Sequence, residues 1–484
     1  MLKQAAFSAS RWASASTLAA TGLQLVQTIV LARLLLPQDF GQMAVVGATL
    51  AVLSLLVDMG LSQALIHYDD VSRNTRSSIY WLNLTFAAAL MFGLMLAAPL
   101  LGAAYQSEEL VPLLRWSSLV FPLAAASQQL RALAAKNLRF DQLAPIDMAA
   151  SMTSLACAIV AALAGAGVYA LVAGLLVRAG VASALAWILL PADYRPTAHF
   201  QPREAQPYLG FGAYLVGETL ANEGHRHADI FAGGLALGSA AMGVYAVPRD
   251  LSMQASRVLN SVVTRVGFPV MARVKDDIPR VRNIYLQTLR MTASVNFPLY
   301  VFLGTFATEV VNLLYGSKWQ HAIMYLQILA VWGLLRSIGN PAGSLLYATG
   351  RTRRAFFWNL GLLALLPPLY WLATFNHGLT GLACGALALQ FLLVVPSWRF
   401  LIRPCCGAGL GEYLAQLLPP LLCAMTAGLA AWGATQDLPH GTLRLVLGTL
   451  VGGLVYIGIS WLFNRSWVDA MWELLCPMIA EKQS

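Results

Sequence analysis

Ionisable side chains gather in one apolar stretch of the sequence, residues 208–238. The stretch is long enough for one membrane-spanning helix, and it carries seven strongly polar residues: Glu218, Asn222, Glu223, His225, Arg226, His227 and Asp229. At about 100° per residue, a continuous helix puts Glu223 and His227 on one face and the other five on another. Ionised side chains at bilayer depth face water-filled cavities or one another, because their insertion into hydrocarbon is costly. The spacing therefore predicts one wall of a polar cavity between membrane helices.

A second polar stripe follows in residues 241–272. Its members, which a helix brings within about 100° of one another, are Asp250, Gln254, Arg257, Ser261, Thr264 and Arg265. We expect the two stripes to face each other. The acids expected inside apolar spans are Asp58, Asp147, Glu218, Glu223, Asp229 and Asp250. The alternative for each of them is a purely structural ion pair, such as Glu223 with His227.

Membrane helices are the elements that must position these side chains. Of the 484 residues, 58% are hydrophobic and 11% are charged, whereas soluble proteins have about 25% charged residues. Only helices can satisfy their own backbone hydrogen bonds through a long series of apolar spans. We predict an all-α polytopic membrane protein without a soluble domain. The fourteen expected spans are residues 12–34, 41–66, 77–101, 110–135, 144–166, 168–191, 208–237, 241–272, 282–308, 320–348, 354–375, 378–402, 411–434 and 442–464.

The charge balance and the cysteines narrow the function classes. A net charge of +9 favours anionic lipid or an anionic substrate. It does not indicate nucleic acid, because no basic soluble domain is present to hold one. The six cysteines lack metal-ligand spacing, and no nucleotide-binding motif occurs. We therefore expect no metal, no cofactor and no ATP hydrolysis.

Lysine and arginine are distributed unequally between the two sides of the expected membrane. The N-terminus and the loops after even-numbered spans carry twenty of them, and the opposite side carries three, Arg33, Lys318 and Arg444. Cytoplasmic loops hold the excess of basic residues in membrane proteins. Both termini are therefore predicted to be cytoplasmic.

The sequence repeats itself weakly. Residues 31–44 parallel residues 233–246, with Gly41 matching Gly243, and the loop at 134–140 parallels the loop at 347–356. We predict two six-helix bundles, an N-lobe over 1–205 and a C-lobe over 206–404, followed by a helix pair and a cytoplasmic C-terminus in 405–484. Because six is even, the bundles are parallel repeats, related by a pseudo-two-fold axis along the membrane normal.

Several short motifs carry a family resemblance by their order and spacing. They are Leu36-Pro-Gln-Asp-Phe-Gly, Leu56-Val-Asp-Met-Gly-Leu-Ser-Gln-Ala-Leu-Ile, Asn137-Leu-Arg-Phe-Asp, Gly165-Ala-Gly-Val-Tyr-Ala-Leu-Val, Asp229-Ile-Phe-Ala-Gly-Gly, Gly243-Val-Tyr and Tyr315-Gly-Ser-Lys-Trp. Over residues 5–404 the chain resembles the Wzx-type flippases. These form the polysaccharide transporter branch of the multidrug/oligosaccharidyl-lipid/polysaccharide (MOP) flippase superfamily, and the colanic acid exporters are the most similar branch. Family members often carry few charges beside the aspartate matching Asp229, whereas this chain carries several.

The resemblance implies a transporter rather than an enzyme. It implies movement of an undecaprenyl-diphosphate-linked oligosaccharide across the bacterial inner membrane by alternating access, coupled to H⁺ or Na⁺. Membrane lipids, and also a polysaccharide polymerase and a chain-length regulator, are the expected partners. The expected ligands of the anionic substrate are Arg226, Arg257, Arg265, Arg290, Arg336 and Arg178. The acids expected to carry the coupling ion are Glu218, Asp229, Glu223, Asp250 and Asp58. For Asp58, as for Asp147, the sequence favours a structural role.

Three other functions compete with this hypothesis. A drug or cation antiporter of the same superfamily predicts an acidic cavity, whereas the expected cavity leans basic. A membrane polysaccharide polymerase or glycosyltransferase needs an aqueous catalytic loop, and the expected outer loops, such as residues 102–109 and 435–441, are short. A scaffold without transport would not need charged residues inside its spans.

Overall fold

The computed structural model describes residues 2–62, 65, 68, 71–465 and 467–469, and the side chains of residues 2–15, 18, 209–215 and 255–269 lie outside this description. All secondary structure within the described residues is helical, as predicted. Two compact units divide the chain. The first consists of Met1–Gly243 and Asn359–Phe375, and the second of Val244–Trp358 and Asn376–Ser484.

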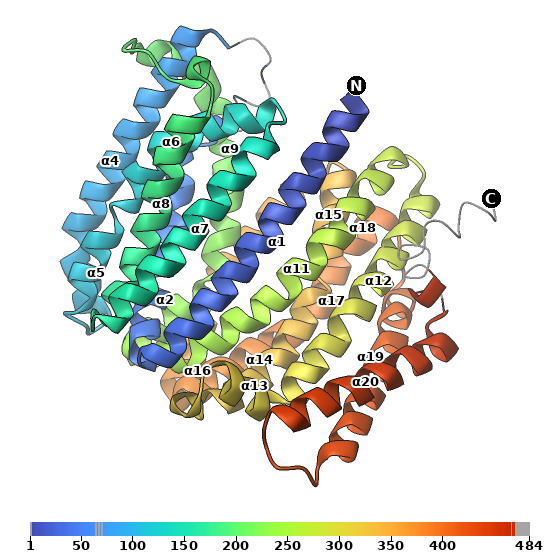
Figure 1. The fold of residues 1–484 in the computed structure, drawn as a ribbon. Coiled ribbons are helices and arrows are strands. Elements are labelled where there is room, and N and C mark those ends of the chain that lie inside the picture. The colour runs from blue at the N-terminus through green and yellow to red at the C-terminus, as the bar shows by residue number, and fades with distance from the viewer. Residues whose placement is uncertain (1, 63–64, 66–67, 69–70, 466, 470–484) are drawn as a thin grey trace. The chain divides into compact units, whose positions relative to one another are not determined.

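The first unit contains the helices of the N-terminal half. They are α1 (Leu2–Leu34), α2 (Pro37–Asp58), α4 (Arg73–Ala104), α5 (Leu110–Ser117), α6 (Val120–Lys136), α7 (Phe140–Leu163), α8 (Tyr169–Leu189), η1 (Ala192–Tyr194), α9 (Pro202–Arg226), α10 (Ala228–Leu237) and η2 (Ala240–Met242). Helix α7 packs against α1 and α8, and α6 packs against α4 and α8, so these helices run side by side (Figure 1). Helix α2 contacts α4, α5, α9 and α10.

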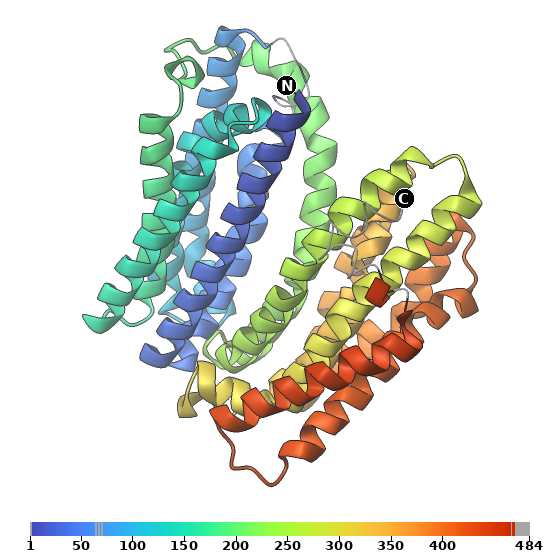
Figure 2. The same cartoon turned by 45° about the vertical axis from the view of Figure 1, so that its right-hand side comes forward.

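The second unit contains the remaining helices, except that residues 359–375 in the middle of α16 belong to the first unit. They are α11 (Gly243–Arg273), α12 (Ile278–Thr305), α13 (Ala307–Leu314), η3 (Ser317–Trp319), α14 (Ala322–Ser337), α15 (Asn340–Ala348), α16 (Thr352–Leu392), α17 (Val394–Ser397), η4 (Trp398–Ile402), α18 (Arg403–Cys406), α19 (Leu410–Thr435) and α20 (Thr442–Phe463). Helix α12 packs against α14 and α19, and α19 pairs with α20 (Figure 2). Helix α16 has non-helical backbone at His377 and Gly378, between the expected spans 354–375 and 378–402.

Length and apolar composition suit many of these helices to a membrane. Nine helices in the described part of the chain are long and apolar enough to cross a bilayer, or ten if α12 and α13, which meet at an angle of 80°, form one bent span. Large apolar side chains point outward, and Leu96, Phe375 and Leu454 are 80%, 75% and 73% exposed. Such a surface suits lipid as the solvent, and helices satisfy their backbone there internally. The count of fourteen spans stays a prediction.

The boundary between the compact units lies at Gly243, whereas the predicted lobes divide at residue 205. Helices α9 and α10 and the turn η2 all contact α2, and α9 also contacts α4. These contacts place residues 202–243 in the first unit. The predicted N-lobe, C-lobe and C-terminal helix pair, and the pseudo-two-fold axis between the lobes, remain predictions.

The two matched glycines of the internal repeat meet within the first unit. A Cβ atom added to Gly41 would lie 2.6 Å from the Gly243 nitrogen and 2.7 Å from the Ala240 carbonyl oxygen. A Cβ atom added to Gly243 would overlap the Pro37 carbonyl group and lie 3.0 Å from the Gly41 nitrogen. Each turn thus packs backbone to backbone on its counterpart. This reciprocal contact requires both residues to be glycine.

Candidate transport site

A polar cavity of about 430 Å³ lies among α1, α2, α6 and α7 in the first unit. Its charged lining residues are Asp58, Arg131 and Asp147, and its polar ones include Gln128 and Ser62. The volume falls in the range of small-molecule sites. Asp58 comes from the end of α2, Arg131 from the last turns of α6, and Asp147 from the first half of α7. Three separate helices therefore bring charged groups to one cavity.

The two acids of this cavity have different partners. The Arg131 Nη2 atom lies 2.6 Å from Asp147 Oδ1, and about a third of each side chain is exposed. Asp58 Oδ1 accepts hydrogen bonds from the Ser62 hydroxyl at 2.6 Å and from the Ser62 backbone N–H at 3.2 Å. Asp147 is therefore paired with a cation, whereas Asp58 is held by neutral donors. An acid held by neutral donors beside a cavity is suited to binding and releasing a cation.

The stretch at 208–238 forms two helices, and the prediction of one continuous helix is wrong at His227. Helix α9 ends at Arg226, and α10 begins at Ala228. Asp229 is 3% exposed, and its Oδ1 atom accepts the backbone N–H of Ile230 at 3.0 Å. That N–H would otherwise donate to the carbonyl group of Arg226 four residues earlier, as in a regular helix. The shared face predicted for Glu218 and Asp229 is therefore interrupted at this junction.

An ionic cluster surrounds the end of α9. Arg226 Nη1 lies 3.0 Å from Glu223 Oε1, and His227 Nε2 lies 3.6 Å from Glu223 Oε2. The predicted pairing of Glu223 with His227 is confirmed. These side chains are about a quarter exposed, and Glu218 is half-buried on the same helix. Glu223 is thus already neutralised within its own helix, which is the structural role that the sequence left open.

The other predicted anion ligands lie in separate places. Arg290 donates from Nε to Asn464 Oδ1 at 2.7 Å and from Nη2 to the Phe463 carbonyl at 3.3 Å, so it binds the C-terminal end of α20. The Arg336 guanidinium lies 5.1 Å from the Trp332 ring centre. Arg178 is exposed on α8. The side chains of Arg257 and Arg265 lie outside the described residues.

The second predicted stripe begins at the start of α11. Asp250 is 58% exposed, and its Oδ1 atom lies 3.6 Å from Nη1 of Arg249, which is 2% exposed. The two stripes belong to different compact units, and their predicted juxtaposition stays a prediction.

A buried ionic cluster in the second unit was missed in the sequence. Glu309 is 2% exposed, and its Oε1 atom lies 2.6 Å from His440 Nδ1 and 3.1 Å from Arg444 Nη1. The cluster joins α13 to the start of α20. Glu309 follows the span 282–308, and His440 and Arg444 precede or begin the last span, all on the predicted outer side. That shared side was the signal from which the cluster could have been found. The pairing of Arg131 with Asp147 was also missed, because no local pattern indicates which residues of the spans 110–135 and 144–166 meet.

Comparison with known proteins assigns the family. Residues 30–324 match the family described as "Polysaccharide biosynthesis protein". This chain belongs to that family. The lipopolysaccharide biosynthesis protein WzxC of Escherichia coli K12 is 29% identical to it over 89% of each chain. The teichuronic acid biosynthesis protein TuaB of Bacillus subtilis 168 is 28% identical over 93% of this chain and 94% of its own.

The fold matches that of a solved lipid flippase. The structure of the lipid II flippase MurJ in an inward closed conformation superposes with a TM-score of 0.72, covering 94% of this chain and 99% of that one, at 14% identity. The resemblance to Wzx-type proteins is therefore confirmed. Together with the apolar helices, these matches make this family member a multi-pass membrane protein.

Proposed function

We propose that this protein is a flippase that moves a lipid-linked oligosaccharide from one leaflet of a membrane to the other. The match of residues 30–324 to a polysaccharide biosynthesis family carries the proposal. The printed names of the relatives refer to lipopolysaccharide and teichuronic acid biosynthesis. The overall fold is that of a protein named as a lipid II flippase. A non-enzymatic transporter accounts for all three observations.

The finer parts of the proposal come from the family resemblance and from the distribution of charge in the sequence. The substrate is an undecaprenyl-diphosphate-linked repeat unit of a surface polysaccharide, and the membrane is the bacterial inner membrane with both chain termini in the cytoplasm. Fourteen helices form an N-lobe and a C-lobe that alternate access to the two sides, as in transporters built from repeats. A polysaccharide polymerase and a chain-length regulator use the product.

Coupling is proposed to use an H⁺ or Na⁺ ion at Asp58. Among the five acids expected to carry the ion, Asp58 lines a cavity, and within the described residues it accepts hydrogen bonds from Ser62. Glu223 already has two basic neighbours, and Asp229 holds a backbone N–H. Asp147 and Arg131 in the same cavity are paired, so their charges cancel. Uptake of a cation by Asp58 therefore neutralises the remaining charge among the charged lining residues. Such a change can bias the equilibrium between two conformations.

The anion-binding arginines are proposed to act on the diphosphate group. Guanidinium groups bind phosphate oxygens through paired hydrogen bonds. Arg226 also pairs with Glu223, Arg336 lies beside the Trp332 ring, and Arg178 is exposed on α8. Arg257 and Arg265 complete the set from the sequence. Arg290 already donates hydrogen bonds to the end of α20, and phosphate binding would have to replace them.

Deletion of the gene in its own bacterium tests the proposal. We expect loss of the surface polysaccharide and accumulation of its lipid-linked repeat unit on the cytoplasmic side, where a periplasmic sugar-specific reagent cannot reach it. A plasmid copy should restore both. Unchanged polysaccharide, or repeat units accumulating on the periplasmic side, would contradict a flippase and favour a polymerase. A drug or cation antiporter would instead change drug sensitivity and leave the polysaccharide intact.

A further inference from the structure

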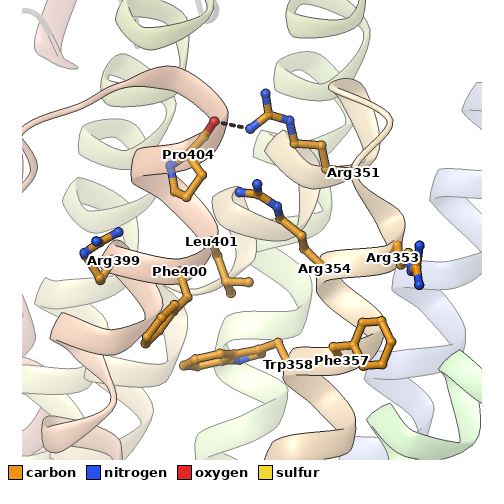
Figure 3. A pocket seen from close by; sticks show the side chains of 9 residues that line it. All are labelled: Arg351, Arg353, Arg354, Phe357, Trp358, Arg399, Phe400, Leu401 and Pro404. Atoms are coloured by element: carbon orange, nitrogen blue, oxygen red, sulfur yellow. Dashed lines mark hydrogen bonds between the residues drawn. The ribbon is translucent and has the colours of Figure 1, made fainter.

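A pocket rich in arginine lies in the second unit, apart from the residues assigned to transport. It has a volume of about 810 Å³ and lies where the start of α16 meets η4 and α18 (Figure 3). Four arginines line it, Arg351, Arg353, Arg354 and Arg399. All four belong to the side of the membrane on which the sequence concentrates its positive charge.

None of these four arginines forms an ion pair with an acid in the described part of the chain. Arg351 donates a hydrogen bond to the Pro404 carbonyl oxygen, and the Arg353 guanidinium lies 5.6 Å from the Phe357 ring centre. Arg354 and Arg399 are exposed. Like charges gathered at one pocket repel one another, and the repulsion is stronger beside a low-dielectric bilayer than in water. An anion in the pocket would remove that repulsion.

The backbone of the pocket also favours an anion. Arg351 is the N-terminal cap of α16, and it follows Gly350, whose φ of +69° lets the chain turn into the helix. The first N–H groups of a helix and its dipole attract negative charge. On the other side, η4 is a π-helical turn over Trp398–Ile402, a rare winding that occurs frequently at functional sites. Three consecutive residues from this turn, 399–401, line the pocket.

Aromatic side chains line the opposite part of the pocket. In Figure 3 the rings of Trp358 and Phe400 lie on one side, and the guanidinium groups of Arg351 and Arg354 lie on the other. Phe400 is 60% exposed. Free inorganic phosphate would use the arginines but leave this apolar part uncovered. A phosphate group attached to a hydrocarbon chain would use both parts.

We propose that this pocket binds the phosphate headgroup of a membrane lipid. The guanidinium groups of Arg354 and Arg399 bind the phosphate oxygens, and the hydrocarbon chain lies against Trp358 and Phe400. Two lipids carry this chemistry, a resident acidic phospholipid and the polyprenyl diphosphate carrier of the transported sugar. The second source rests on the proposed function, whereas the first does not.

Native mass spectrometry of the purified full-length protein tests the site by titration with phosphatidylglycerol. The double variant Arg354→Gln/Arg399→Gln should bind this lipid about tenfold more weakly or worse, because two charge-assisted ligands are lost. The double variant Lys275→Gln/Arg280→Gln is the matched control, since it removes two charges from exposed residues of the same unit outside the pocket. It should bind within about twofold of the wild type. The Arg354→Lys/Arg399→Lys variant should fall between these, because lysine keeps the charge and loses the paired hydrogen bonds.

Competition identifies the lipid. Displacement of phosphatidylglycerol by undecaprenyl diphosphate at lower concentration would assign the pocket to the carrier lipid, and the reverse order would assign it to a resident phospholipid. Equal binding by the wild type and the Arg354→Gln/Arg399→Gln variant would overturn the site. Phosphatidylcholine binding as tightly as phosphatidylglycerol would also overturn it. Binding is measured without transport, so a failed flipping assay would leave this result unaffected.

Discussion

The carboxylates of Asp58 and Asp147 line the same cavity but have different bonding partners. Asp147 pairs with Arg131 at 2.6 Å, and Asp58 accepts hydrogen bonds from Ser62. The Arg131 guanidinium balances the charge of the Asp147 carboxylate. A carboxylate held by a hydroxyl group and an amide can gain or lose a cation with a larger change in local charge. We therefore propose that Asp58 binds the coupling ion and that Asp147 has a structural role.

Asparagine substitutions separate these two roles. In proteoliposomes, Asp58→Asn should remove the acceleration of flipping by an inward proton or sodium gradient and leave slow, gradient-independent flipping. The amide keeps an oxygen that can accept the Ser62 hydrogen bonds, so the fold should persist. Asp147→Asn should keep the response to the gradient and lower stability by about 0.2–1 kcal/mol, the usual value of a partly exposed ion pair. A normal gradient response in Asp58→Asn would exclude this acid from coupling.

Glu204 gives a pH-dependent prediction at the first turn of α9. His199 Nε2 lies 3.1 Å from Glu204 Oε1, and the Ser78 hydroxyl donates to Glu204 Oε2 at 2.9 Å. The hydrogen bonds from His199 and then Ser78 hold the pKa of Glu204 below its usual value. Because the folded-state pKa is the lower one, this contact stabilises the protein above the unfolded-state pKa. Its contribution is lost as the pH falls through the folded-state pKa.

Hydrogen exchange measures this effect locally. The Gln201 backbone N–H donates to Ser78 Oγ at 3.0 Å, so its protection factor should fall when Glu204 becomes protonated in acid. Glu204→Gln should lower protection at neutral pH and remove the acid-dependent change. Asp193→Asn is a matched control, because Asp193 has an exposed side chain in the same segment between α8 and α9. This variant should retain the acid-dependent change in protection. An unaltered pH dependence in Glu204→Gln would show that another group is responsible.

Reciprocal glycine packing acts at the scale of elements. Gly41 and Gly243 lie at matched positions of the internal repeat, and each would bring a Cβ atom into the backbone of the other turn. Backbone atoms cannot move aside as a flexible side chain can. Gly41→Ala and Gly243→Ala should each lower the free energy of unfolding by about 1–3 kcal/mol or more, as in overpacked cores.

A third glycine provides the control for this packing. No atom lies within 4 Å of a Cβ atom added to Gly47, on the same helix as Gly41. Gly47→Ala should therefore leave the unfolding temperature in detergent unchanged or raise it, because alanine favours the helix. If Gly41→Ala and Gly47→Ala unfold at the same temperature, the close contact does not stabilise the protein.

The position of a helix could be predicted from the sequence where it follows from the length of an apolar run. The helical class and the positions of spans such as 144–166 and 442–464 follow from runs of apolar residues, and α7 and α20 cover all but their last three and one residues, respectively. The junction at His227 was not predictable, because periodicity assumes one regular helix and the Asp229 carboxylate takes a backbone N–H there. Partners distant in the chain, such as Arg131 with Asp147 or Glu309 with Arg444, require tertiary packing that no local pattern encodes.

Topology is the prediction at the scale of the whole molecule. The twenty-to-three distribution of basic residues predicts phosphatase activity for reporter fusions at residues 104 and 437. Fusions at 137, 278, 352 and 484 should instead give cytoplasmic fluorescence. A periplasmic signal at residue 278 would contradict the two-lobe arrangement. Such a signal requires either an odd number of membrane crossings before residue 278, where eight spans are expected, or a periplasmic N-terminus.

Direct observation of lipid movement between leaflets tests the proposed flippase activity. Proteoliposomes are prepared with the purified protein and a fluorescent undecaprenyl-diphosphate-linked oligosaccharide in both leaflets, and a membrane-impermeant quencher is added outside. If the protein is a flippase, label from the inner leaflet will reach the outer leaflet, and quenching will go to completion. Protein-free liposomes will retain their inner-leaflet fluorescence. Flippase activity is contradicted if liposomes that contain the folded protein retain the same fraction of unquenched fluorescence as protein-free liposomes, with and without an ion gradient.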